Sequence, residues 1–219
     1  MGIFLSALIG SIIGSFCGVV IDRLPAGESI VFGRSHCGTC QAQLRSWELI
    51  PILSAVSARF RCRRCKARFP IWYTGLEIFY AVIFAMTFIG WIEPSVALCL
   101  LMTATLSIFD WQSHSFPFIV WLFFAALIFL TGNFQLWMLI FLALSALTEI
   151  FHWPIGSGDL LWLFTAALTV NFLQLIEIVQ IASLTGILYY FLAKKKGELA
   201  FIPFLGLGYL AVLLAQKIL

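Results

Sequence analysis

The stretch IFLSALIGSIIGSFCGVVI occupies residues 3–21 and contains no charged side chain. At about 1.5 Å per residue, a helix of this length spans a hydrocarbon core of about 30 Å. No Lys or Arg precedes the stretch, and Asp22 follows it directly, so we expect a retained membrane helix rather than a cleaved signal peptide. Small residues recur every four positions on one face and predict close packing against a second helix: Gly10, Gly14 and Gly18.

The whole chain has the composition of a membrane protein. Of its 219 residues, 62% are hydrophobic and only 11% are charged, and the mean hydropathy is +1.04. A soluble core could not bury so much apolar surface. We therefore expect an all-α polytopic protein with about eight membrane helices, at residues 3–21, 72–92, 94–110, 116–131, 134–152, 159–172, 175–193 and 199–215.

The basic residues predict the orientation of these helices. Nine of the thirteen Lys and Arg lie between residues 22 and 69, and three more form the run Lys194, Lys195, Lys196. If residues 22–71 are cytoplasmic, alternation places the turns at 110–115 and 153–158 and the lysine run on the same side, as the positive-inside rule requires. Orientation in the bilayer explains the basic stretch with fewer assumptions than nucleic-acid binding, so we expect no nucleic-acid partner.

Two C-x-x-C pairs in the long polar segment predict a metal site. Their spacing is typical of a four-thiolate zinc site that closes the coordination shell and is therefore structural. Two disulfides are the alternative, which a reducing cytosol disfavours. The expected ligands are Cys37, Cys40, Cys62 and Cys65.

Two of the three aspartates in the chain lie where predicted helices meet the same membrane surface. Asp159 follows the glycines of Gly156-Ser157-Gly158 and opens a helix, so it could simply be a helix cap. Asp110 ends a helix, where the helix dipole disfavours a negative charge, and is therefore the stronger functional candidate. On this reasoning Asp159 would be ionised and Asp110 would hold the proton.

A pair of carboxylates of this kind can hydrolyse a peptide bond without a covalent intermediate. One carboxylate takes a proton from water, and the protonated partner donates a hydrogen bond to the carbonyl oxygen. Gly156 and Gly158 would let the backbone approach the substrate and supply N–H donors.

The motifs taken together resemble the type IV prepilin peptidases. They fall in the same order over nearly the whole chain: Gly14-Ser15-Phe16 with Val19 and Arg23-Leu24-Pro25, the paired C-x-x-C, Asp110 with Pro117, G-x-G-D at 156–159, and Pro203 to Gly208. The resemblance implies a membrane aspartic endopeptidase that removes leader peptides from prepilins or competence pseudopilins, with Asp110 and Asp159 as the catalytic pair. It further implies a multi-pass protein of the bacterial cytoplasmic membrane, in contact with lipid, whose active site faces the cytoplasm.

The same resemblance raises a second activity. Many relatives methylate the new N-terminus with S-adenosylmethionine, an activity associated with the N-terminal half. Glu77 matches an acidic position of the family, and its role could be methyl transfer, support of the site or purely structural. The expected organisation is a first helix at 1–21, a cytoplasmic loop domain at 22–71 and a seven-helix membrane domain at 72–219.

Two other functions remain open. A proton-coupled transporter could use the two aspartates as an ion path, but it predicts carboxylates near the middle of the membrane and repeated halves. A non-enzymatic scaffold could dock a partner through the zinc loop, but it leaves Asp110 unexplained.

Overall fold

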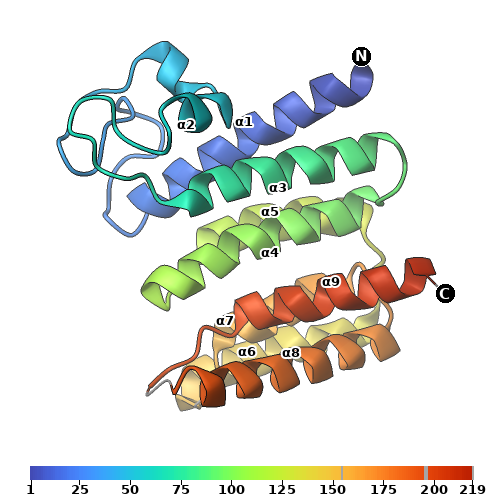
Figure 1. The fold of residues 1–219 in the computed structure, drawn as a ribbon. Helices are drawn as coiled ribbons and strands as arrows, with labels where there is room; N and C mark the ends of the chain where they lie inside the picture. Colours follow the sequence, from blue (N-terminus) through green and yellow to red (C-terminus); the bar gives the residue numbers. More distant parts are fainter. Residues whose placement is uncertain (154, 195–196, 219) are drawn as a thin grey trace. The chain divides into compact units, whose positions relative to one another are not determined.

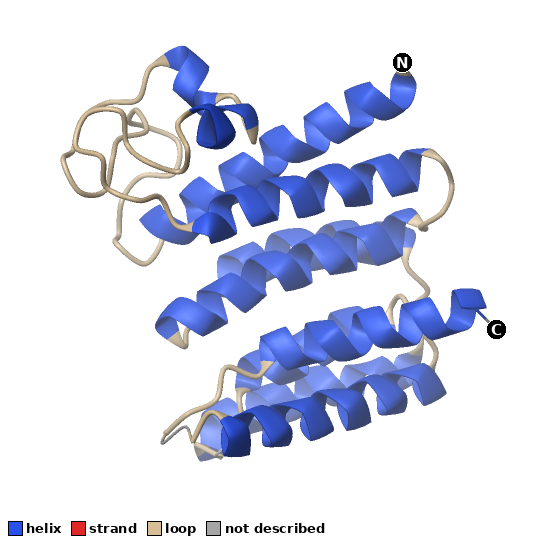
Figure 2. Cartoon of the chain, viewed as in Figure 1, coloured by secondary structure: helices blue, strands red, loops and turns tan. Residues whose placement is uncertain are grey.

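The protein is all-helical and polytopic. The computed structural model describes residues 1–153, 155–194 and 197–218, so Lys195 and Lys196 of the predicted basic run lie outside the described residues. Figure 2 shows helices joined by loops, and the described residues form no strand beyond two isolated bridges. The chain divides into two compact units, Met1–Glu93 and Pro94–Leu219.

The first unit is a helix pair that carries the polar loop (Figure 1). Its elements are α1 (Gly2–Arg23), the short 3₁₀ helix η1 (Ser46–Leu49), α2 (Leu53–Ser57) and α3 (Ile71–Phe88). The predicted glycine face is confirmed, because α3 packs against it. A Cβ on Gly10 would lie 2.6 Å from the Tyr80 carbonyl oxygen, and one on Gly14 would lie 3.1 Å from the Glu77 Cα. The glycines therefore set the separation of the two helices.

The second unit contains the remaining helices (Figure 1). They are α4 (Pro94–Ser113), α5 (Phe118–Thr131), the 3₁₀ turn η2 (Leu136–Met138), α6 (Leu139–Phe151), α7 (Ser157–Ala167), α8 (Phe172–Leu192) and α9 (Ile202–Ile218). Within this unit α4 packs against α5, α7 and α9, while α7 also contacts α5, α6 and α8. The helix α7 is thus surrounded by four others.

Each of the eight predicted membrane segments is helical, but their lengths differ from the predictions. Four helices of the described chain are long and apolar enough to cross a membrane: α1, α3, α4 and α8. The stretches 118–131, 136–151 and 202–216 are apolar but shorter. The helix α7 has only 11 residues and ends at Ala167 rather than at Phe172, while α4 continues three residues beyond Asp110.

Buried polar contacts fix α7 inside its unit. The Trp162 indole is completely buried and donates a hydrogen bond to Thr103 Oγ1 on α4 at 2.8 Å. The Trp121 indole on α5 donates to the Leu161 carbonyl oxygen at 3.1 Å. Such bonds hold a short helix in one register, because breaking them would leave buried donors unsatisfied.

Candidate active site and metal centre

Asp110 lies in the last turn of α4 and is half-buried. Its Oδ2 accepts a hydrogen bond of 3.0 Å from the backbone N–H of Ile202, the first residue of α9. The first N–H groups of a helix lack partners within the helix and carry partial positive charge. The Asp110 side chain therefore caps the N-terminus of α9, although the two residues are 92 positions apart in the sequence.

Asp159 is the third residue of α7, where the N-cap is Gly156. Its backbone N–H donates to the Gly156 carbonyl oxygen at 3.2 Å. Asp159 is also half-buried, and the carboxylates of Asp110 and Asp159 are close enough to interact electrostatically. Two helices that are separate in sequence therefore bring both acidic side chains to one place within the second unit.

The structure removes the reason for assigning the shared proton to Asp110. The sequence placed Asp110 at the negative end of its own helix with nothing to cap, whereas its carboxylate lies at the positive end of α9. Asp159 lies at the positive end of α7. Both carboxylates therefore experience a favourable helix dipole, and the assignment of the shared proton stays a prediction without that support.

The glycines of the G-x-G-D segment each make room for a particular group. A Cβ on Gly156 would lie 2.8 Å from Oδ2 of Asp159, so the acidic side chain folds back over its own N-cap. A Cβ on Gly158 would lie 2.5 Å from the Phe116 ring. These contacts explain the glycines as spacers for Asp159 and Phe116, and their predicted role toward the substrate stays a prediction.

The four cysteines of the loop form a compact cluster in the first unit. Their Sγ atoms all lie within 4.8 Å of one another, and the Sγ atoms of Cys37 and Cys65 are 3.8 Å apart. A tetrahedral zinc ion with Zn–S bonds of about 2.3 Å separates its sulfurs by about 3.8 Å. All six cysteines of the chain are described and none is in a disulfide, so the cluster fits the predicted four-thiolate zinc site.

The two halves of this cluster have the same backbone geometry. In the first half Cys37 N–H donates to Ala42 O at 3.0 Å, and in the second Cys62 N–H donates to Ala67 O at 2.8 Å. The backbone N–H of Cys40, with that of Thr39, stabilises the Cys37 thiolate and lowers the thiol pKa to about 6, although burial acts in the opposite direction. The pKa of Cys62 is lowered in the same way. A lowered pKa favours the thiolate form that binds metal.

Glu77 connects the loop to α3. Glu77 is 9% exposed, and its Oε2 accepts a hydrogen bond of 2.7 Å from the backbone N–H of Ile52. A buried acidic side chain requires such a donor. This contact gives Glu77 a structural partner, and a role of Glu77 in methyl transfer stays a prediction.

Sequence reasoning missed several residues that position the aspartates: Thr103, Phe116, Trp162 and Ile202. One signal was available for the last of them. Proline is favoured in the first turn of a helix, and Pro203 therefore indicates that α9 begins close to Ile202 rather than at Leu199. The partner of that helix end could not be read from the sequence.

Comparison with known proteins connects this geometry to a family. Residues 8–91 match the Bacterial Peptidase A24 N-terminal domain. The Type 4 prepilin-like proteins leader peptide-processing enzyme of Escherichia coli O78:H11 is 28% identical over 95% of this chain and 92% of its own length. The chain is similar to proteins that are named for the processing of prepilin leader peptides.

Other relatives share shorter regions with the chain. The prepilin leader peptidase/N-methyltransferase of Myxococcus xanthus is 39% identical over 35% of this chain and 23% of its own length. The enzyme of the same name from Bacillus subtilis is 37% identical over 36% of this chain and 32% of its own length. No solved structure matches the chain significantly. These similarities confirm the resemblance to the prepilin peptidases.

Proposed function

We propose that this protein is a membrane aspartic endopeptidase that cleaves the leader peptide from type IV prepilins or competence pseudopilins. The observation that supports the proposal is that Asp110 and Asp159, from two separate helices of one unit, are close enough to interact electrostatically. Relatives named for prepilin leader processing supply the substrate class.

In the proposed reaction the two carboxylates share one proton. The ionised carboxylate takes a proton from a water molecule, whose oxygen attacks the carbonyl carbon of the scissile peptide. The protonated carboxyl donates its hydrogen bond to the carbonyl oxygen as negative charge develops there. When the C–N bond breaks, the proton gained by the first carboxylate passes to the leaving amine. The helix N-termini beside the aspartates stabilise the negative charge of the pair throughout.

The aspartates occupy positions that favour an enzyme over a transporter. Asp110 is in the last turn of α4 and Asp159 in the first turn of α7, whereas an ion path predicts carboxylates near the middle of the spans. We further propose that the site faces the cytoplasm in the bacterial inner membrane, on the side of the basic loop.

Mass spectrometry of a pilin produced together with this protein tests the proposal. We expect the leader to be removed only when the protein is present, which appears as a shortened pilin with one defined new N-terminus. An unprocessed pilin in membranes that contain the folded protein would contradict the peptidase assignment.

The same spectrum tests a second reaction. Several relatives are named prepilin leader peptidase/N-methyltransferase, and residues 8–91 match the N-terminal domain of the bacterial A24 peptidases. We propose that S-adenosylmethionine is the methyl donor for the newly exposed amine. In that case the processed pilin carries the additional mass of one methyl group.

The contact between Ile202 and Asp110 gives a further prediction for activity. Proline fits the first position of a helix but has no N–H, so Ile202→Pro removes the donor to Asp110 while preserving the start of α9. A hydrogen bond to a charged group contributes about 1.5–3 kcal/mol. We expect prepilin cleavage to fall about tenfold or more, measured as the rate of leader removal in proteoliposomes.

The matched control is Ile202→Ala, which removes the buried side chain and retains the N–H. Ile202 is 3% exposed, so both variants lose packing and only the proline variant loses the hydrogen bond. Equal rates for the two variants would show that the N–H does not position Asp110.

A further inference from the structure

The segment between the two cysteine pairs differs from the rest of the polar loop. Residues 46–58, SWELIPILSAVSA, contain one charged side chain, Glu48, and are flanked by Arg45 and Arg59. The segment folds into η1 and α2. Large apolar side chains of this segment are exposed to solvent in the isolated chain: Trp47, Leu49, Ile50, Leu53 and Val56. A loop in water would not be expected to expose so many in thirteen residues.

Two contacts show at which height along α1 and α3 this segment lies. The backbone N–H of Ile52 donates to Glu77, which is six residues and about 9 Å from the start of α3. Glu77 faces Gly14 of α1, which is about 12 Å from Asp22 at the charged end of that helix. Ile52 therefore lies beside the interior of the helix pair rather than beyond its end.

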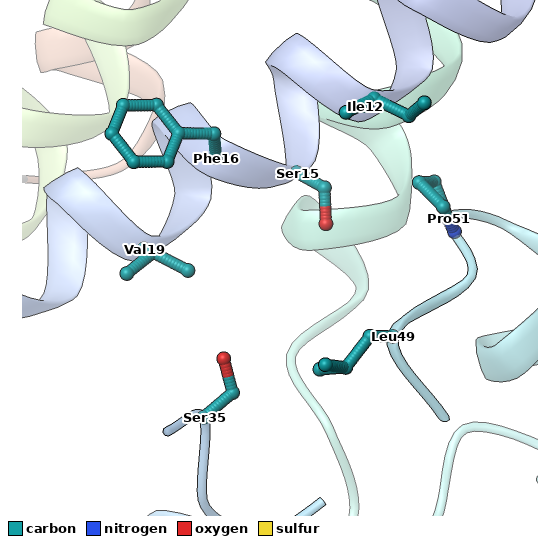
Figure 3. Close-up of a pocket in the computed structure, with 7 residues that line it drawn as sticks. All are labelled: Ile12, Ser15, Phe16, Val19, Ser35, Leu49 and Pro51. Carbon is teal, nitrogen blue, oxygen red and sulfur yellow. The ribbon is translucent and has the colours of Figure 1, made fainter. Parts of the chain in front are cut away.

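A pocket on the outer side of α1 gives the same position independently. It has a volume of about 210 Å³ and is lined by Ile12 and Ser15 of α1 together with Leu49 and Pro51 of the segment. Figure 3 shows Leu49 and Pro51 on the side of α1 that carries Ser15. Ile12 is about 15 Å from Asp22.

Several polar groups of the segment have partners within the protein, which lowers the cost of placing the segment in a membrane. Backbone N–H groups within hydrocarbon must be satisfied by the protein itself. The Ile52 N–H is bonded to Glu77 Oε2, the Ser54 N–H to the Ile50 carbonyl oxygen, and the Val56 N–H to the Ile52 carbonyl oxygen. Glu48 accepts a hydrogen bond from the Arg45 N–H and lies 3.7 Å from Arg63.

We propose that residues 46–58 form a re-entrant segment embedded in the leaflet at the Arg23 end of α1, with Leu53 and Val56 in contact with the acyl chains of anionic phospholipids. The basic residues that flank the segment carry the charge that anionic head groups complement. Trp47, beneath the Arg45 guanidinium at 5.1 Å, is suited to the interface between head groups and acyl chains. This inference does not depend on the catalytic chemistry proposed above.

Photocross-linking of the full-length protein tests the proposal. A benzoylphenylalanine residue replaces Leu53, which is 67% exposed, in nanodiscs that contain equal amounts of phosphatidylglycerol and phosphatidylcholine. Ile9, exposed on α1, is the positive control, and Gln43, exposed in the first cysteine half, is the negative control. If the variant at 53 does not fold, Val56 takes its place.

We expect lipid adducts at position 53 in a yield similar to that at position 9, and none at position 43. Phosphatidylglycerol adducts at position 53 should exceed phosphatidylcholine adducts by about threefold or more. Lipid adducts at position 9 but not at 53, or cross-links from 53 to residues 94–219 or to a second copy of the chain, would overturn the membrane location. Equal yields of the two lipid adducts would overturn the assignment to anionic lipid.

Discussion

Replacing either Asp110 or Asp159 by asparagine abolishes prepilin cleavage, which we expect to fall by at least about a thousandfold in each single variant. General acid and base groups each contribute about 10²- to 10⁴-fold. Asparagine matches the shape of the side chain but can neither take a proton from water nor share one with its partner. Because the two groups act as a unit, the double variant should be no slower than the slower single variant. The measurement is the rate of leader removal from a purified prepilin in proteoliposomes.

The loss should occur without unfolding. An asparagine at position 110 still offers a carbonyl oxygen to the Ile202 N–H, which lies 3.0 Å from Asp110 Oδ2, so the start of α9 keeps its cap. The chain has only one other aspartate, the exposed Asp22, and Asp22→Asn is the matched control that should leave cleavage unchanged. A single variant at 110 or 159 that cleaves at close to the wild-type rate would remove the basis of the aspartic mechanism.

The sequence predicted which residues converge better than it predicted what holds them. The spacing of the cysteines was enough to predict the four metal ligands. Each C-x-x-C turn holds its two thiolates close together, and a four-thiolate site then requires only that the two turns pack against each other. The donor from Ile202 to Asp110 joins positions 92 residues apart. A contact between helix ends of that kind depends on tertiary packing, which no local pattern encodes.

The ends of the helices show a second limit. Hydrophobicity continues from α7 through residues 168–172, so the predicted segment ended at Phe172, but the helix ends at Ala167. The break has a local cause in Asn171, whose side chain caps α8 by accepting from the Gln174 N–H at 2.9 Å, while Gln174 Oε1 accepts from the Asn171 N–H at 2.7 Å. This capping box is visible in the sequence. Apolar content shows that a segment prefers lipid, whereas caps show where its hydrogen bonding stops.

Removal of zinc should unfold the loop of the first unit. We expect one zinc ion per chain, measured by inductively coupled plasma mass spectrometry, and none after Cys37→Ser combined with Cys62→Ser. Structural zinc binding contributes about 10–16 kcal/mol at neutral pH, which exceeds the stability of most small domains. Regular secondary structure between α1 and α3 is limited to η1, α2 and two isolated bridges, so we expect the metal to be the main cross-link of this region. Limited trypsin digestion should then cut rapidly at the exposed Arg59, Arg61, Arg63 and Arg64.

The effect should be specific to the clustered thiols and should depend on pH. Cys17 is buried in α1, outside the cluster, so Cys17→Ala should retain one zinc ion and resist trypsin like the parent chain. Protons compete with zinc for thiolates, so zinc should be lost as the pH falls. The backbone N–H groups that lower the pKa of Cys37 to about 6 delay that competition, because the thiolate form of Cys37 persists until the pH falls below this value. A chain that lacks zinc at neutral pH and still resists trypsin would show that the cysteine cluster holds the loop without a metal.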